Sequence, residues 1–214
     1  MAQRLTASTL ALAIGCLLAA CGGGPHLGSD PTGPPRPSKL TPAPEPPDVS
    51  FSASADVNDE QVTIEYEIVN HGDRPIVAFN RVPSTDSPNP EPGEPENFYV
   101  EPSGTGAVLS KQVFRTPEGV SVYARQVLRG TIVEAGERIS EHIITGSTYE
   151  TRRPYQELLG YDQETVQAEF VDVCIGVALA ANVTALSKDA HPIYPHDTRT
   201  ANQQHMYCSS PGSS

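Results

Sequence analysis

Tryptophan is missing from the 214-residue sequence, and aromatic residues of all kinds make up only 6% of it. Proteins that bind carbohydrate strongly usually hold the sugar against stacked aromatic rings, so strong sugar binding is disfavoured here. The residues that could gather into such a platform are Tyr99, Tyr123, Tyr149, Tyr155 and Tyr161.

Motifs that mark common catalytic sites are also missing. The sequence contains no GxSxG, no P-loop, no SxxK and no GxGxxG after a strand pattern. An enzyme is therefore not predicted, and no cofactor is expected. The alternative is an extracytoplasmic hydrolase with a loop-built site, for which His191, His196, Asp197 and the tyrosines are the available groups.

Basic residues are scarce relative to acidic ones. The chain has 14 Lys and Arg against 26 Asp and Glu, a net charge of −12. Such a charge repels phosphate backbones, so no nucleic-acid partner is expected. One acidic segment without Lys or Arg predicts a Ca²⁺ site, a contact surface for a cationic partner, or simply a solvated loop, although no EF-hand spacing is present. Its acidic residues are Asp86, Glu91, Glu94, Glu96 and Glu101.

Long hydrophobic runs are lacking as well. The apolar stretch 10–18 is too short to span a bilayer, which takes about 20 residues. It follows the single basic residue Arg4 and precedes two alanines, which is the order of a secretory signal. The later stretch 170–181 contains Asp172 and is also too short.

The junction "LAAC" at 18–21, followed by Gly22, resembles the lipobox of bacterial lipoproteins. The resemblance implies that residues 1–20 are a cleaved signal peptide and that the Cys21 thiol carries a diacylglyceryl group. Two or more acyl chains, such as palmitate, anchor a protein stably in a membrane. The expected location is extracytoplasmic and lipid-anchored, in the outer membrane where the organism has one. In some bacteria an aspartate directly after the lipidated cysteine retains a lipoprotein in the inner membrane, and this sequence has Gly22 at that position.

Residues 21–48 are predicted to be a disordered linker. The stretch 22–48 holds nine of the 21 prolines and five glycines, with almost no large apolar side chain. Such a composition favours extended polyproline II, with a reach of several tens of Å at about 3.1 Å per residue. A docking role for "PPRP" is the alternative to a plain spacer. Residues 211–214 are expected to be a disordered tail.

Residues 49–210 are predicted to form one β-sandwich domain. Strict alternation of apolar and polar residues in 49–57 and 62–68 indicates half-buried strands. The stretch 170–179 is apolar at successive positions, which is typical of a central strand. Residues 153–160 have a brief helical pattern. Further strands are predicted at 76–79, 97–100, 107–114, 121–128, 131–144 and 203–208, giving an all-β, antiparallel fold.

Two segments carry a resemblance to bacterial immunoglobulin-like domains, and to the sandwich of intracellular proteinase inhibitors. "VTIEYEIVNHGDRPIVAF" at 62–79 contains a strand that ends in Asn before a glycine, and "VLRGTIVEAGERISEHI" at 127–143 has "AGE" before a strand. The resemblance implies an immunoglobulin-like β-sandwich. The proline-rich acidic insert 83–97 departs from it as a long loop.

Four cysteines are present, at positions 16, 21, 174 and 208. Cys16 leaves with the signal peptide and Cys21 is lipidated, so Cys174 and Cys208 remain in an oxidising compartment. A disulfide between them is predicted to contribute around 3 to 4 kcal/mol. A catalytic thiol is the alternative, but the apolar neighbours of Cys174 disfavour a thiolate.

The segment "HPIYPHD" at 191–197 offers His191, His196 and Asp197 as candidate metal ligands. Imidazole and carboxylate together suit zinc or copper. Their spacing matches neither HExxH nor a zinc finger, and the two prolines favour an irregular surface loop, so no metal is expected.

These patterns predict a cell-envelope lipoprotein that acts as a non-enzymatic binding or assembly module. Its partners are expected to be the membrane, through the N-terminal lipid, and another envelope protein. The alternatives are the hydrolase described above and a protease inhibitor in which loop 83–97 serves as bait.

Overall fold

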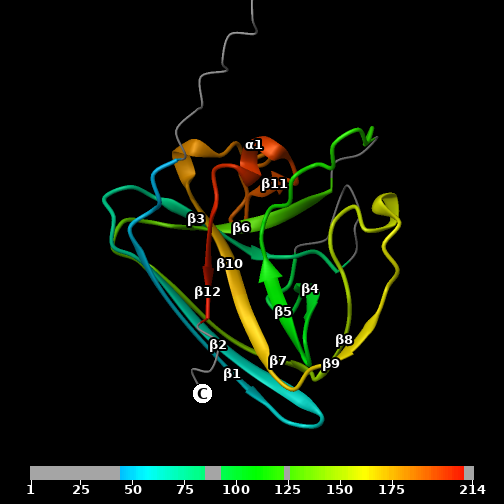
Figure 1. The fold of residues 1–214 in the computed structure, drawn as a ribbon. Coiled ribbons are helices and arrows are strands. Elements are labelled where there is room, and N and C mark those ends of the chain that lie inside the picture. Colours follow the sequence, from blue (N-terminus) through cyan, green and yellow to red (C-terminus); the bar gives the residue numbers. More distant parts are fainter. Residues whose placement is uncertain (1–43, 85–92, 123–125, 210–214) are drawn as a thin grey trace, which may run out of the picture. The chain divides into compact units, whose positions relative to one another are not determined.

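Two β-sheets pack face to face in the computed structural model, which describes residues 44–84, 93–122 and 126–209 (Figure 1). The predicted signal peptide, Cys21 and most of the linker lie outside these ranges, as do residues 85–92 of the acidic insert and the tail. None of the helices within the described ranges is long and apolar enough to cross a bilayer.

Within the described ranges, sheet A has three strands in the order β1-β2-β7 and sheet B has seven, in the order β11-β6-β3-β10-β5-β4 with β12 beside β10. A separate two-stranded sheet pairs β8 with β9. The bounds in sheet A are β1 Val49–Val57, β2 Gln61–Asn70 and β7 Arg138–Gly146. Those in sheet B are β3 Ile76–Arg81, β4 Tyr99–Ser103, β5 Gly106–Lys111, β6 Val127–Val133, β10 Val171–Leu179, β11 Ile193–Pro195 and β12 His205–Cys208. The small sheet comprises β8 Thr148–Glu150 and β9 Thr165–Gln167.

The alternation in β1 and β2 places one face of sheet A in the core and the other in water, as predicted. Val62, Ile64 and Ile68 are fully buried, whereas Glu65 is exposed between them. Since side chains alternate across a strand, each charged residue of this run lies on the outer face.

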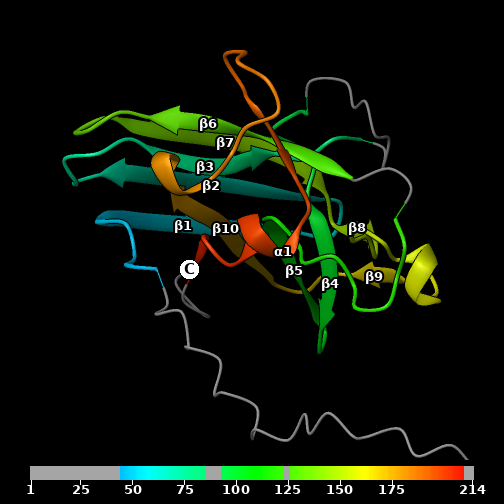
Figure 2. The ribbon, with the colours of Figure 1, turned by 90° about the horizontal axis from the view of Figure 1, so that it is seen from above.

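Strand β10 is the centre of sheet B, which confirms the prediction from its apolar sequence. One edge pairs with β5 over Val171–Ile175 and with β3 over Val177–Leu179, and the other edge pairs with β12. The side chain of Val177 belongs to the core between the sheets, and that of Ala178 belongs to a second apolar cluster on the opposite face. Ala201 of the short helix α1 (Thr198–Ala201, labelled in Figure 2) packs against this second cluster, as do Phe114 and Val183.

The all-β prediction is confirmed, but sheet B is mixed rather than wholly antiparallel. Strands β5 and β10 pair in parallel, with Val171 opposite Ala107 and Ile175 opposite Lys111. Parallel neighbours need a long crossover connection. Here β6, β7, β8 and β9 all lie between the two strands in sequence.

Asn70 joins two corners at which the chain crosses between sheets A and B. The β2–β3 corner begins at Asn70, whose side-chain amide donates to the carbonyl oxygens of Val133 and Glu134 at 3.1 Å in the β6–β7 corner. In return, Gly136 N–H donates to the Asn70 carbonyl oxygen at 2.9 Å, with the φ of Gly136 at 77°. The Asn-Gly and Ala-Gly-Glu segments therefore meet in space.

Strand β5 ends at Lys111, three residues before the predicted end. The backbone of Val113 pairs with the side chain of Gln204: its N–H donates to Oε1 at 2.9 Å, and its carbonyl accepts from Nε2 at 2.6 Å. The Gln204 side chain thus makes the two hydrogen bonds to the Val113 backbone that a neighbouring strand would otherwise make. Gly176 leaves space for it, because a Cβ there would lie 2.5 Å from Gln204 Oε1.

The predicted helix at 153–160 is a turn that leads into the 3₁₀ helix η1, Glu157–Leu159. Its sequence contains both Pro154 and Gly160, which limit regular helix to a single turn. Two other short helices were not predicted, η2 at Ala180–Asn182 and α1 at Thr198–Ala201.

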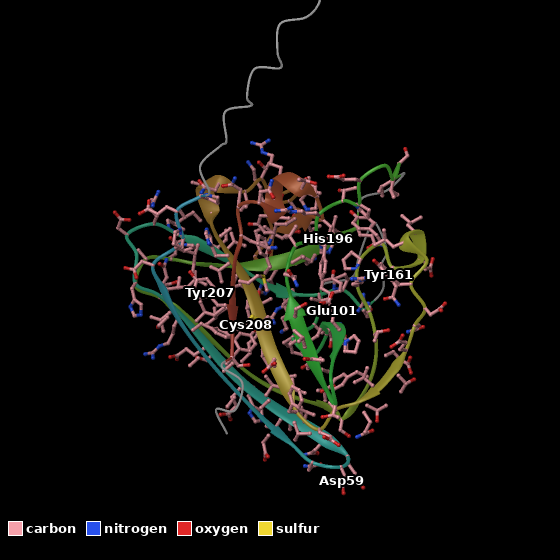
Figure 3. All side chains as sticks on the ribbon, in the orientation of Figure 1. Asp59, Glu101, Tyr161, His196, Tyr207 and Cys208 are labelled. Carbon is pink, nitrogen blue, oxygen red and sulfur yellow. A yellow bond between two sulfur atoms is a disulfide. The ribbon has the colours of Figure 1, made fainter. Side chains whose placement is uncertain are left out.

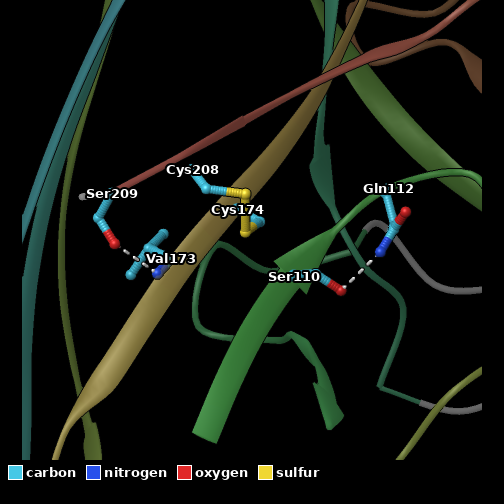
Figure 4. The surroundings of a disulfide bond; sticks show 6 residues. All are labelled: Ser110, Gln112, Val173, Cys174, Cys208 and Ser209. Atoms are coloured by element: carbon cyan, nitrogen blue, oxygen red, sulfur yellow. Dashed lines mark hydrogen bonds between the residues drawn. A yellow bond between two sulfur atoms is a disulfide. The ribbon is translucent and has the colours of Figure 1, made fainter. Parts of the chain in front are cut away.

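The predicted disulfide between Cys174 and Cys208 is present and joins β10 to β12 (Figure 4). The two cysteines are directly opposite each other in the antiparallel register. Beyond them, Ser209 is tied to Val173 through its backbone N–H at 2.8 Å and its hydroxyl at 3.0 Å. The disulfide therefore fixes the last described strand to the centre of sheet B.

Candidate functional site

His196, one of the candidate metal ligands and labelled in Figure 3, is fully buried and central to a hydrogen-bonded cluster. Its Nδ1 accepts from the backbone N–H of Phe114 at 3.0 Å. The proton of the neutral ring therefore lies on Nε2, which donates to the Tyr99 hydroxyl at 2.7 Å. Both ring nitrogens are engaged within the protein.

The environment of His196 keeps its ring neutral. Burial lowers its pKa to about 3, and the positive charge of Arg152 acts in the same direction. The ring also contacts Tyr99 and Phe114 edge to face, with centroids 5.4 and 5.9 Å away. These contacts make His196 part of the packing beneath the surface.

The other two candidate ligands have different roles. Asp197 is the N-cap of α1, and its carboxylate accepts from the Thr200 N–H at 2.7 Å. His191 Nδ1 lies 3.2 Å from the Thr131 hydroxyl. Across the part of the chain that the structure describes, no group of three His, Cys, Asp or Glu side chains could hold a metal ion.

The main chain of His196 fixes the start of a surface loop. The hydroxyl of the buried Tyr155 donates to the His196 carbonyl oxygen at 2.7 Å, and the Tyr155 N–H donates to Gln126 Oε1 at 3.0 Å. Tyr155 has a φ of 65°, a left-handed conformation that non-glycine residues rarely adopt and that persists only where the surroundings impose it. The turn at Tyr155 directs the following residues outward.

Residues 154–164, here called loop 154–164, project from the domain in two perpendicular views (Figures 1 and 2). Every residue from 157 to 164 is exposed. Three of them are large and apolar: Leu158 is 56% exposed, Leu159 40% and Tyr161 53%. An exposed apolar group of this kind is typical of a contact surface.

Internal hydrogen bonds hold the shape of loop 154–164. The N–H of Leu159 donates to the Tyr155 carbonyl oxygen at 3.0 Å, and the N–H of Tyr161 donates to that of Gln156 at 3.2 Å. Gly160, with a φ of 67°, supplies the left-handed residue that ends η1. The loop is thus formed before any partner arrives.

A cleft of about 320 Å³ lies beside this loop. Val100 and Pro102 of β4 line it, together with Tyr161 of the loop. Figure 3 shows Glu101 and Tyr161 on the same side of the domain. We call this feature the acidic cleft, because Glu101, Asp162 and Glu164 line it together with Arg153.

Arg153 is the one basic side chain among the lining residues of the acidic cleft. Its guanidinium carbon lies 3.8 Å from the centroid of the Tyr161 ring, and its Nη1 lies 3.6 Å from Glu101 Oε1. Among the described residues, no basic side chain pairs with the carboxylates of Asp162 or Glu164.

A second group of charged residues is buried between the sheets. Lys111 is fully buried, and its Nζ lies 3.3 Å from Glu141 Oε2 and 2.7 Å from the Pro95 carbonyl oxygen. Glu141 also accepts from the Tyr66 hydroxyl and from Arg81. A buried charge is costly unless it is paired and hydrogen-bonded, and this group meets both conditions.

The pKa values within this second group depend on burial and on its members' charges. Burial lowers the pKa of Lys111 to about 8, against the opposing effect of Glu141. Burial alone would raise the pKa of Glu141, but Lys111, Tyr66 and Arg81 hold it below its ordinary value. The pKa of Tyr66 is raised well above its ordinary value, mainly by burial.

A groove of about 470 Å³ crosses sheet A near these residues. Its exposed carboxylates have partners within sheet A. Glu65 lies 3.1 Å from His142 Nδ1, and Glu67 accepts from the Ser140 hydroxyl at 3.0 Å. The acidic cleft differs because the carboxylates of Asp162 and Glu164 have no such partner among the residues that the structure describes.

Two of the contact residues of loop 154–164, Leu158 and Leu159, were not predicted from the sequence as site residues. Leu158 and Leu159 lie in the predicted helical stretch 153–160, and Tyr161 was named only as a member of a possible aromatic platform. The sequence signal for this surface is a pair of leucines, followed by Gly160 and Tyr161, in a segment after Pro154 that is too short to bury them.

No protein-family model matches the chain, and neither the curated proteins nor the solved structures contain a significant match to it.

Proposed function

We propose that this protein is a lipid-anchored binding module of the cell envelope and that its partner, another protein, docks on loop 154–164. The acyl chains at Cys21 hold it to the membrane, and residues 22–48 act as the spacer. The observation that carries the proposal is the anchoring of this loop by Tyr155, which presents Leu158, Leu159 and Tyr161 to solvent.

The energetics of loop 154–164 favour binding. Complete burial of one leucine side chain contributes about 1.5–3 kcal/mol, so two leucines and a tyrosine can form the centre of an interface. A loop that is already ordered loses little conformational entropy when a partner binds. The left-handed backbone at Tyr155 is the type of strain that structures retain at binding sites.

The alternatives have less support from the geometry. A hydrolase that used His196 would need a ring nitrogen open to substrate, but both nitrogens are engaged and the residue is fully buried. Most of the proposed bait of a protease inhibitor, residues 85–92, lies outside the described ranges. The binding module is therefore the function that we propose.

Photo-crosslinking in intact cells tests the proposal. Benzoylphenylalanine placed at position 158 of the full-length protein is expected to crosslink to one discrete partner protein. The same group at position 186 is the matched control, because Leu186 is 60% exposed and lies in a different loop. The purified partner is then expected to bind the Leu158→Ser/Leu159→Ser variant at least 10-fold more weakly than the wild type, and the Leu186→Ser variant equally well.

Equal crosslinking from positions 158 and 186 would contradict the proposal. So would unchanged affinity of the double serine variant for the purified partner. Circular dichroism of both serine variants shows whether the fold is retained.

A further inference from the structure

We propose that the acidic cleft receives a lysine or arginine side chain of the partner protein that docks on loop 154–164. This inference rests on the proposed function and adds the chemistry of the partner. The partner would present a cationic side chain next to an apolar pocket for Leu158 and Leu159. Three features of the cleft lead to this assignment.

The first feature is the combination of surfaces in the cleft. Val100, Pro102 and the Tyr161 ring provide apolar walls, and carboxylates stand beside them. A lysine or arginine packs its aliphatic stem against apolar surface and keeps its charged head near polar groups. A volume of about 320 Å³ accommodates one such side chain.

The second feature is Arg153, which already shows how a guanidinium binds in this cleft. It stacks on the Tyr161 ring and pairs with the Glu101 carboxylate. Aromatic faces attract cations, and the attraction increases when water is excluded. The carboxylates of Asp162 and Glu164, which pair with no basic side chain of the described residues, are available to a cation supplied by a partner.

The third feature is the charge balance. The cleft has three carboxylates, those of Glu101, Asp162 and Glu164, and one guanidinium. Elsewhere, Lys111 and Arg81 are directed into the core, where both pair with Glu141. The lining of the cleft therefore carries a net charge of −2, of the same sign as the chain's −12, and it is complementary to a basic partner.

NMR titration of the full mature chain tests the inference with defined probes. The peptide acetyl-Leu-Arg-Leu-amide is compared with acetyl-Leu-citrulline-Leu-amide, which has nearly the same shape without the charge. Shifts at 100–102 and 151–164 are expected with the arginine peptide, and its affinity is expected to be at least 10-fold higher. Raising the salt concentration should lower the affinity for the arginine peptide and leave that for the citrulline peptide unchanged.

Variants that remove single carboxylate charges test whether the arginine peptide binds in the cleft. Asp162→Asn and Glu164→Gln are each expected to lower the affinity for the arginine peptide 3- to 10-fold. Glu134→Gln, an exposed acid in the β6–β7 corner, is the matched control and should leave its affinity unchanged. Shifts that lie outside the cleft, or that are equal for both peptides, would overturn the inference.

Failure of this inference is distinguishable from failure of the proposed function. Specific crosslinking from position 158 without charge-selective peptide binding would overturn the cation site and leave the binding module intact. Charge-selective peptide binding without specific crosslinking would support the cation site and overturn docking on the leucines.

Discussion

Tyr155 and His196 are 41 residues apart in sequence, and the hydroxyl of one donates a 2.7 Å hydrogen bond to the main-chain carbonyl of the other. This bond connects a buried cluster on sheet B to the start of the exposed loop 154–164. Changes at either residue are therefore expected to affect both stability and the order of the loop.

Replacing Tyr155 with phenylalanine removes only this hydroxyl. The free energy of unfolding is expected to fall by about 1–2 kcal/mol, because a buried carbonyl loses a good donor. Amide exchange at Leu159 and Tyr161 should accelerate more than exchange in β10. Tyr161→Phe is the control, since that ring is exposed, and a stability loss equal to that of Tyr155→Phe would contradict the role of the buried hydroxyl.

Acid is expected to destabilise the protein through His196. Its pKa is about 3 when folded, against about 6.5 in an unfolded chain, so the unfolded state binds more protons as the pH falls below 6.5. Between pH 7.5 and 5.0 the free energy of unfolding should fall by about 2 kcal/mol from this residue. Urea unfolding of wild type and His196→Gln measures the difference, and identical pH slopes would refute the assignment.

Lys111 is expected to have the opposite effect at high pH. Its pKa is about 8 when folded and about 10.4 in an unfolded chain, so the folded state loses its proton first and is stabilised as the pH rises. Between pH 7.5 and 9.5 the free energy of unfolding should rise by about 1–2 kcal/mol. Lys111→Met should abolish the rise. The range stops below pH 10, where the raised pKa of Tyr66 acts in the other direction.

Loss of the disulfide is expected to destabilise the domain without changing its fold. The bond closes a sequence separation of 34 residues, which contributes about 3–4 kcal/mol in the chain-entropy model. Urea unfolding of the Cys174→Ala/Cys208→Ala variant measures this loss. A loss below 1 kcal/mol would show that β12 is held mainly by its backbone pairing and by Ser209.

The anchor is tested by replacing Cys21 with serine. Without acyl chains the protein should leave the membrane fraction, since no other segment of the sequence is long and apolar enough to hold it there. Fractionation and mass spectrometry of the N-terminus provide the measurement. Retention of residues 1–20 in the wild-type protein, or unchanged membrane association of Cys21→Ser, would contradict the lipoprotein assignment.

The sequence predicted those parts of the fold in which a local pattern determines burial. The alternation at 49–57 gave the bounds of β1, and the apolar run at 170–179 gave the central position of β10. Partners distant in sequence were not predictable. The end of β5 depends on Gln204, which lies 91 residues from Val113, and the parallel pairing of β5 with β10 depends on the path of the intervening chain.

The candidate site was harder to predict for the same reason. His196 was identified as a chemically distinctive residue, but its burial and its partners Tyr99 and Phe114 come from other segments. Leu158 and Leu159 fit a helical pattern that a 3₁₀ turn satisfies only in part. Exposure of an apolar side chain depends on the absence of a neighbouring element, which a local pattern does not encode.

The position of β10 has a consequence for how the chain acquires its structure. This strand is the middle of sheet B, yet it begins at residue 171, and its partners β3 and β5 precede it by 60 residues or more. Most pairings in sheet B must therefore wait until nearly the whole polypeptide has been synthesised. Because such non-local contacts form slowly, we expect truncations before residue 179 to remain unfolded and the complete chain to refold on a millisecond-to-second timescale.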